Sequence, residues 1–441
     1  MAQRPQVQHI DEYGYPTRPD TRRKLRNHLV SLSKRVLLKG IYLLASIYGA
    51  LLRLVSIGRK RTALTPQTFH PRRILVLRLD LIGDLVLSLT VVHALKRTYP
   101  EAEIDLLAIP ASARVVEHDP DLAEIIPYDP NIWRRPKALL QARNWRAAAA
   151  LRQRLRARHY DLAVSIFGPW AAILAVLSGA KRRVGFACES YPGFMTDRVA
   201  GGHWQIGDHL HEVDYCLKLA HAAGASVLPD ERIPRLIVAP EAREEVQALL
   251  RQEGLDPGRP LIACHVSSNN GQSKRWPIPY WATLIDYLIS QDGYNVVLTG
   301  APADQPLIAA ISRRAHERPI NTAGKTSLPQ LAALLQCADL LVTGDSGPMH
   351  IAGAVGTPLI AIHGPTDPAM SGPVSPEATV LRSNIWCSPC YSARGGPADC
   401  RFFTTQCMKD IKPEQVITVI HDKLQTQAQK PERLTEQGAA E

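Results

Sequence analysis

The 441-residue sequence lacks an N-terminal secretion signal, because its first twenty residues are polar and contain no early apolar segment with a small-residue cleavage site. It also lacks, near that end, an uncharged run long enough to cross a bilayer comfortably. The run from 40 to 52 spans roughly 20 Å as a helix, against about 30 Å of hydrocarbon. We therefore expect a cytoplasmic protein in a reducing compartment.

Excess basic charge is scarce beyond the first 61 residues. The net charge is +11, and residues 1–61 alone hold thirteen Lys/Arg against Asp11, Glu12 and Asp20. The rest of the chain is nearly neutral, whereas a nucleic-acid-binding protein distributes basic charge over its binding surface. The sequence thus argues against nucleic acid as a partner.

Two nucleotide-binding motifs are incomplete or misplaced. Gly324-Lys325-Thr326 resembles the end of a P-loop, but Pro319 stands where its first glycine belongs. Asp119-Pro120-Asp121 fits the Asp-x-Asp metal signature only formally, because it lies in a turn-like stretch. We assign function to neither motif.

The N-terminal segment divides into two parts. Residues 1–20 are polar, and we expect them to be disordered. Residues 21–62 begin with apolar side chains at helical spacing among basic ones: Leu25, Leu29, Leu32 and Val36. This pattern predicts a basic amphipathic helix lying in an anionic membrane surface. A spanning helix with Lys39 and Arg53 snorkelling, or a helix packed on the protein's own core, are the alternatives.

Two series of short apolar strands alternate with helices, which predicts an α/β protein with two Rossmann-like domains and parallel sheets facing a central cleft. Expected strands lie at 72–79, 104–108 and 160–166, and then at 261–266, 295–299, 340–343 and 358–362. We predict a first domain over 71–228, a proline-containing linker over 229–258 and a second domain over 259–410. A C-terminal helix over 411–424 and a tail over 425–441 follow.

Ligands of parallel sheets bind beyond the carboxyl ends of the strands, so the loops after the strands are the candidate sites. In the first loop, Gly83 permits a tight turn and Asp84 places a carboxylate at the mouth of the cleft. A general base for an acceptor hydroxyl needs such a carboxylate. The alternative is that Asp84 only caps the following helix.

The loop 344–350 opens a helix with glycines and small polar residues. The backbone N–H groups of Ser346 and Gly347 would face a diphosphate, Asp345 would bind sugar hydroxyls, and His350 would face the same ligand. A capped helix with a structural histidine is the alternative.

Two further segments carry polar or basic side chains. In the loop 267–277, Ser267, Ser268 and Lys274 form a candidate phosphate clamp, unless the loop is merely solvated. Residues 131–158 hold nine Lys/Arg and no acid, which suits contact with phosphate or a membrane surface as well as a solvated helix face. Arg134 and Arg135 are its candidate acceptor-loop residues.

Four sequence motifs occur together in this chain: the Ile-Gly-Asp turn at 82–84, the serine-rich loop ending in Lys-x-Trp-Pro, Gly-Lys-Thr-Ser-Leu at 324–328, and the block GDSGPMHIAGAVGTPLIAIHGPTDP. In this combination the chain resembles glycosyltransferase family 9, the heptosyltransferase-like enzymes, over about residues 72–421. This resemblance implies a GT-B fold, ADP-heptose as donor, and inversion at the anomeric carbon without a catalytic metal.

The same resemblance implies roles for individual residues. Asp84 would be the base, Lys274 the phosphate contact, and Asp304 an acidic contact to the ribose. Asp345, Ser346, Gly347 and His350 would form the donor site. Ser267-Ser268 and Ser346 replace threonines common in the family, and compact members lack the basic N-terminal extension.

Four of the eight cysteines cluster near the C-terminus, at Cys387, Cys390, Cys400 and Cys407. The Cys-x-x-Cys start is typical of a structural zinc site, although the later spacing is irregular. Four thiolates would leave no open position for catalysis.

The sequence thus predicts an inverting glycosyltransferase on the inner face of a bacterial cytoplasmic membrane. It would move a sugar, expected to be heptose, from a nucleotide-diphospho-sugar to a lipid-linked saccharide such as lipopolysaccharide core. The alternatives are a sugar-nucleotide epimerase or hydrolase of the same fold and a non-catalytic membrane-bound scaffold.

Overall fold

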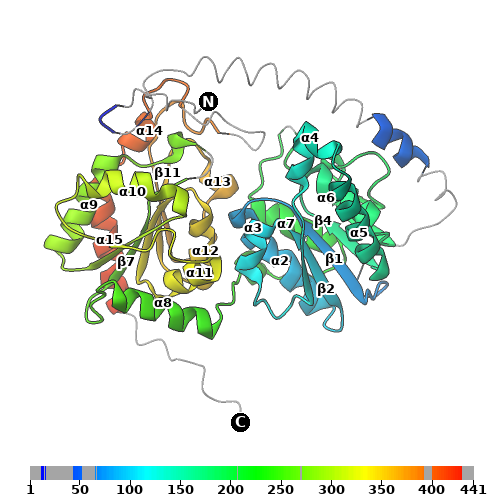
Figure 1. Cartoon of the computed structure of the whole chain (residues 1–441), viewed down its shortest axis with the longest axis horizontal. Helices are drawn as coiled ribbons and strands as arrows, with labels where there is room; N and C mark the ends of the chain where they lie inside the picture. Colours follow the sequence, from blue (N-terminus) through cyan, green and yellow to red (C-terminus); the bar gives the residue numbers. More distant parts are fainter. Residues whose placement is uncertain are drawn as a thin grey trace, which may run out of the picture.

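A computed structural model describes residues 11–13, 15, 43–51, 65, 67–205, 207–268, 271–391 and 400–429. These residues form two α/β domains that lie side by side, with the N-terminal half of the chain in one and the C-terminal half in the other (Figure 1).

The first domain is built on a six-stranded parallel sheet of order β3-β2-β1-β4-β5-β6. Its strands are β1 (Arg73–Arg78), β2 (Glu103–Ala108), β3 (Glu124–Pro127), β4 (Leu162–Ser165), β5 (Arg182–Phe186) and β6 (Asp197–Val199). Its helices are α2 (Ile82–Thr98), α3 (Pro110–Ala113), α4 (Pro136–Leu139), α5 (Ala142–Ala157), α6 (Gly168–Leu177) and α7 (Glu212–Ala222).

The second domain repeats this topology. Read in the same direction, its sheet has the order β9-β8-β7-β10-β11-β12. Its strands are β7 (Leu261–His265), β8 (Asn295–Thr299), β9 (Ile320–Asn321), β10 (Leu340–Gly344), β11 (Leu359–His363) and β12 (Ala378–Arg382). Its helices are α8 (Pro240–Gln252), α9 (Ile278–Ser290), α10 (Gln305–Ser312), α11 (Leu328–Cys337), α12 (Gly347–Val355), α13 (Pro368–Ser371), α14 (Gln406–Lys409) and α15 (Pro413–Ala428).

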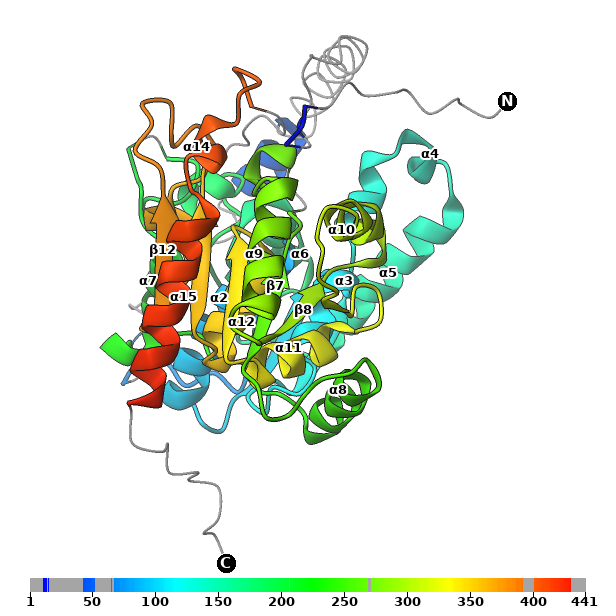
Figure 2. The ribbon, with the colours of Figure 1, turned by 90° about the vertical axis from the view of Figure 1, so that its left-hand side faces the viewer.

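Helices cover both faces of each sheet, which explains why the strands are continuous apolar runs. On β1, Ile74 and Val76 join the core that contains α2 and α7, whereas Leu75 and Leu77 join the core under α5 and α6. In the second domain, α9 and α15 cover the outer face of the sheet, and α11 and α12 face the first domain (Figures 1 and 2).

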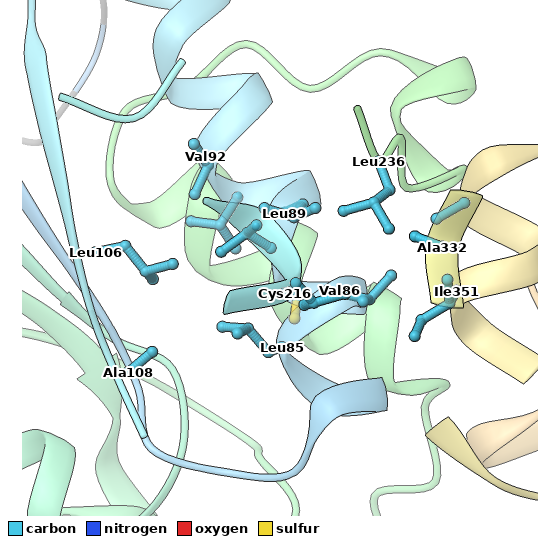
Figure 3. Packing of buried hydrophobic residues seen from close by; sticks show 14 of the residues in the cluster. Leu85, Val86, Leu89, Val92, Leu106, Ala108, Cys216, Leu236, Ala332 and Ile351 are labelled. Carbon is cyan, nitrogen blue, oxygen red and sulfur yellow. The ribbon is translucent and has the colours of Figure 1, made fainter. Parts of the chain in front are cut away.

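The two domains share one hydrophobic core. Leu85, Val86 and Leu89 of α2 belong to the same buried cluster as Ala332 of α11 and Ile351 of α12 (Figure 3). Helices α2 and α12 therefore pack directly against each other, which places the first turns of both helices at the domain junction.

The structure differs from the expected linker over 229–258. Only residues 233–239, which include Pro234, form an irregular connection before α8. Pro229 begins a short 3-10 helix and Pro240 begins α8, as proline favours the first turn of a helix. Helix α8 packs on α11 and belongs to the second domain. The last helix, α15, begins at Pro413 and ends at Ala428, four residues beyond the expected end.

Two parts of the N-terminal segment are described. Tyr15 is buried, its hydroxyl donates to the carbonyl of Arg275, and Asp11 forms an ion pair with Lys409. These contacts correct the expectation of disorder for residues 11–13 and 15, while the rest of the segment 1–20 lies outside the described residues. They show an anchor that no apolar periodicity reveals. Of the predicted helix 21–62, only residues 43–51 are described, and they are helical. Within the described part of the chain, no helix combines the length and apolarity that crossing a bilayer requires.

Candidate active site

The loop after β1 brings Asp84 to the domain junction. Asp84 lies in the first turn of α2, whose N-cap position is Leu81 and carries no side-chain cap. Asp84 therefore does not cap the helix, and its carboxylate instead lies 3.5 Å from the guanidinium of Arg78. The side chain is one-third exposed, so it remains accessible to solvent.

Gly83 is needed for a different reason than the one expected. It lies within α2 and does not adopt a left-handed backbone. A Cβ atom at this position would come within 2.6 Å of Cδ2 of His350 in α12. Glycine thus allows the two domains to approach each other beside the site.

A buried chain of charges lies behind Asp84. Arg78 is 1% exposed and donates to Glu212 at 2.7 Å, and Glu212 accepts from Nε2 of His203 at 2.7 Å. The other ring nitrogen, Nδ1 of His203, lies 2.6 Å from Glu189. Two charges of each sign alternate along this chain, so each buried ion has a partner of opposite charge.

These neighbours set the proton affinity of Asp84. Burial raises its pKa to about 7, Arg78 opposes the rise, and the carboxylates of Asp80, Glu212 and Asp345 add to it. Because Asp345 belongs to the second domain, side chains of both domains affect the pKa of Asp84.

The second domain contributes an ion pair to the junction. Nζ of Lys274 lies 2.6 Å from Oδ2 of Asp345, and both side chains are almost fully buried. Burial alone would raise the pKa of Asp345, but Lys274 and His363 lower it below its usual range. The ammonium of Lys274 also lies 4.4 Å from the ring centre of Tyr391. Lys274 is therefore held in one position at the end of β7.

The start of α12 faces the first domain. Its N-cap, Ser346, makes no side-chain cap bond and instead lies 3.0 Å from the hydroxyl of Thr343. An added Cβ on Gly347 would be in contact with Ile82 and Gly83. The start of α12 thus lies at the junction, and a helix N-terminus favours an anion.

His350 lies one turn into α12 and is buried. Burial is the main cause that lowers its pKa to about 4, and Asp345 offsets this only in part. Its Nδ1 is buried and has no hydrogen-bond partner within the described structure. An unpaired polar atom of this kind does not fit a purely structural histidine.

Ser267, Ser268 and Asp304 are buried at the ends of β7 and β8, and the hydroxyl of Ser267 donates to Asp304. The carbonyl of Ser268 instead accepts from the guanidinium of Arg275, at 3.4 Å. Arg135 is exposed between a 3-10 helix and α4, and it makes no hydrogen bond or ion pair with Asp84 or Lys274 in the described structure. The side chain of Arg134 lies outside the described residues.

Asp119 of the Asp-x-Asp stretch has a structural environment. It is buried, lies 3.0 Å from Nε2 of His93, and accepts from the N–H of Asp121. His93 is nine residues along α2 from Asp84, or roughly 14 Å. The discounted motif therefore lies away from the candidate site.

Comparisons with known proteins identify the family. The model of glycosyltransferase family 9 (heptosyltransferase) matches residues 148–395. The chain belongs to this family. It is a glycosyltransferase, as the resemblance implied.

Curated relatives of this glycosyltransferase match over most of their length. Lipopolysaccharide heptosyltransferase 2 of Salmonella typhimurium is 29% identical over 362 residues, covering 80% of this chain and 98% of the relative. Lipooligosaccharide heptosyltransferase 2 of Haemophilus influenzae is 28% identical, covering 80% of this chain and 99% of the relative.

Solved structures confirm the GT-B fold. The family 9 glycosyltransferase of Veillonella parvula superposes with a TM-score of 0.66 at 23% identity, covering 80% of this chain and 97% of that one. ADP-heptose lipopolysaccharide heptosyltransferase II of E. coli gives a TM-score of 0.63 at 26% identity, covering 81% and 99%.

Sequence analysis missed the chain of charges behind Asp84. One signal was present, because Arg78 interrupts the apolar strand Ile74-Leu75-Val76-Leu77, and a charged residue in a buried strand requires a partner. Its partner, Glu212, is 134 residues away, so spacing could not identify it.

Proposed function

We propose that this family 9 glycosyltransferase moves a heptose from ADP-heptose to a lipopolysaccharide core or a related surface glycolipid, with inversion at the anomeric carbon. The observation that carries the proposal is the convergence of Asp84 from one domain and the Lys274–Asp345 pair and α12 from the other. The names of the curated relatives support the donor and acceptor class.

The proposed reaction is a single displacement. The acceptor oxygen bonds to the anomeric carbon on the face opposite the diphosphate, and Asp84 takes the hydroxyl proton. The bond between that carbon and the phosphate oxygen breaks, and ADP leaves with its electron pair. Lys274 and the N–H groups at Ser346 and Gly347 stabilise the charge that grows on the diphosphate. Asp345 keeps Lys274 in place for this role.

Donor consumption with and without acceptor tests this proposal. Calorimetry with a panel of nucleotide-sugars should select ADP-heptose, and the purified enzyme should release ADP rapidly only when a lipopolysaccharide-core acceptor is added. Rapid consumption or epimerisation of the donor alone would favour the epimerase or hydrolase. Absence of nucleotide binding would favour the scaffold.

We further infer that residues 43–51 attach the enzyme peripherally to a membrane. One side of this helix packs on the first domain, where Gly49 touches the backbone of Pro192 and the ring of Tyr48 contacts that of Phe194. The other side exposes apolar side chains, with Leu44 69% and Ile47 53% exposed. An exposed apolar helix face next to a basic segment suits an anionic bilayer.

Vesicle flotation tests this attachment. Leu44→Glu/Ile47→Glu should reduce binding to vesicles that contain an anionic phospholipid, because these substitutions place charge on the apolar face. Leu228→Glu, at an exposed leucine that precedes the 3-10 helix at Pro229, serves as the control and should bind like the parent. Equal flotation of all three proteins would disprove the attachment through this helix.

A further inference from the structure

The four C-terminal cysteines converge although they are far apart along the chain. Cys387 and Cys390 follow β12, whereas Cys407 lies in α14 after residues 392–399, which are outside the described structure. Their side chains reach the same cavity, although no three of the four sulfur atoms lie within 4.8 Å of one another in the described structure. All four are free thiols.

The four side chains surround one small cavity. All of them line a space of about 20 Å³, together with Ser273 and Tyr391. A volume of this size holds a single water molecule or ion. It is too small for a sugar or a nucleotide.

The backbone holds these cysteines in place. The N–H groups of Cys390 and Tyr391 both donate to the carbonyl of Pro365, at 2.9 and 2.8 Å. A Cβ added to Gly364 would come within 3.0 Å of the sulfur of Cys407. The loop after β11 therefore brings the two cysteine segments together.

A tight turn follows Cys400. The N–H of Phe403 donates to the carbonyl of Cys400 at 3.2 Å. Phe403 and Thr405 adopt left-handed backbone conformations, which non-glycine residues rarely adopt. This turn leads directly from Cys400 to α14 and Cys407.

We propose that Cys387, Cys390, Cys400 and Cys407 bind one divalent transition-metal ion through four thiolates, with zinc as the expected ion. Four sulfur ligands are typical of structural tetrahedral sites, and they leave no position for a substrate. The ion would be a structural clamp and not a catalyst. The guanidinium of Arg401, which also lines the cavity, offsets part of the negative charge of the thiolates.

The site adjoins the active site. Tyr391 follows Cys390 directly and places its ring against the ammonium of Lys274. Ser273, which lines the cavity, directly precedes Lys274 in the sequence. A metal clamp at Cys390 thus fixes one wall around Lys274. The metal would therefore also affect binding of the donor, and this effect rests on the proposed function.

Metal analysis of the full-length protein, purified under reducing conditions, tests the site without any use of activity. We expect one zinc ion per chain in the parent, and almost none in Cys387→Ser or in Cys400→Ser. Cys337→Ser alters a half-buried cysteine on α11 and is the matched control, which should keep the full metal content. Cobalt exchanged into the parent should show the visible absorption of tetrahedral cobalt thiolate, a result that does not depend on the folding of a variant.

The possible results separate the claims. A parent without stoichiometric metal, or one with disulfides among the four cysteines, would overturn the site. One iron ion per chain, lost in the same variants, would support the ligands and overturn zinc as the occupant. Removal of the metal by a chelator should weaken ADP binding by about tenfold, the value of one hydrogen bond to a charged group. If the metal-loaded parent bound no nucleotide, the metal site would stand and the proposed function would fail.

Discussion

At the scale of single residues, the environment of Asp84 suits a proton acceptor at neutral pH. Burial and three nearby carboxylates raise its pKa to about 7, and Arg78 prevents a larger rise. A base with a pKa close to the working pH combines a useful ionised fraction with a strong tendency to take a proton. The same residue would be a weaker base if it only capped a solvated helix.

The pH dependence of transfer tests this environment. Because only the ionised form of Asp84 accepts a proton, kcat/KM should fall as the pH drops through about 7. Glu212→Gln should move this midpoint to lower pH, since the charge of Glu212 raises the pKa of Asp84 and its loss leaves Arg78 free to interact with Asp84.

Asp214→Asn provides the matched control for this prediction. Asp214 lies on the same helix, but its partner is the exposed Arg232, so the midpoint should not move. A pH profile of kcat/KM measured for the three proteins decides the matter. A flat profile in the parent, or an unchanged midpoint in Glu212→Gln, would contradict the assignment of the base.

At the scale of elements, the contact between α2 and α12 sets the distance between the domains. Gly83 is the closest point of this contact, because a side chain there would collide with the ring of His350. The ring belongs to a well-packed junction with little room to move.

Gly83→Ala should therefore destabilise the protein by roughly 1–3 kcal/mol, the usual cost of overpacking a core. The loss should be much smaller when His350→Ala is also present, because the colliding ring is then absent. Urea unfolding of the single and double variants measures both values. Gly258→Ala, at an exposed glycine without backbone strain, is the control. An equal loss in both backgrounds would show that the collision does not limit the approach of the helices.

The elements also show what the sequence could predict. The buried strands were predictable because both faces of a parallel sheet are covered, so strands such as β7 and β10 are uninterrupted apolar runs. Five strands carry no such pattern and were not predicted: β3, β5, β6, β9 and β12. Proline misled the prediction around Pro240, because a cluster of prolines indicates a linker and a helix start equally well.

Part of the candidate site could be predicted, because its residues lie in segments that follow the ends of strands. Asp84, Lys274, Asp345 and His350 follow three different strands, and the structure brings them to one junction. The partners of Arg78 were not predictable, because they depend on how distant segments pack.

At the scale of the whole molecule, the two domains carry complementary halves of one site. The same strand order in both sheets places the loops after β1, β7 and β10 at the points where ligands bind to such sheets. The shared core then holds these loops opposite each other. The proposed proton acceptor lies on one side, and the proposed anion-binding groups lie on the other.

The most direct test of this division compares Asp84→Asn with Lys274→Met, using calorimetry with ADP and transfer rates on the same preparations. Asp84→Asn should bind ADP like the parent and lose transfer by about 10²–10⁴-fold, the usual contribution of a general base. Lys274→Met should bind ADP more weakly. Transfer by Asp84→Asn at the rate of the parent would contradict the account.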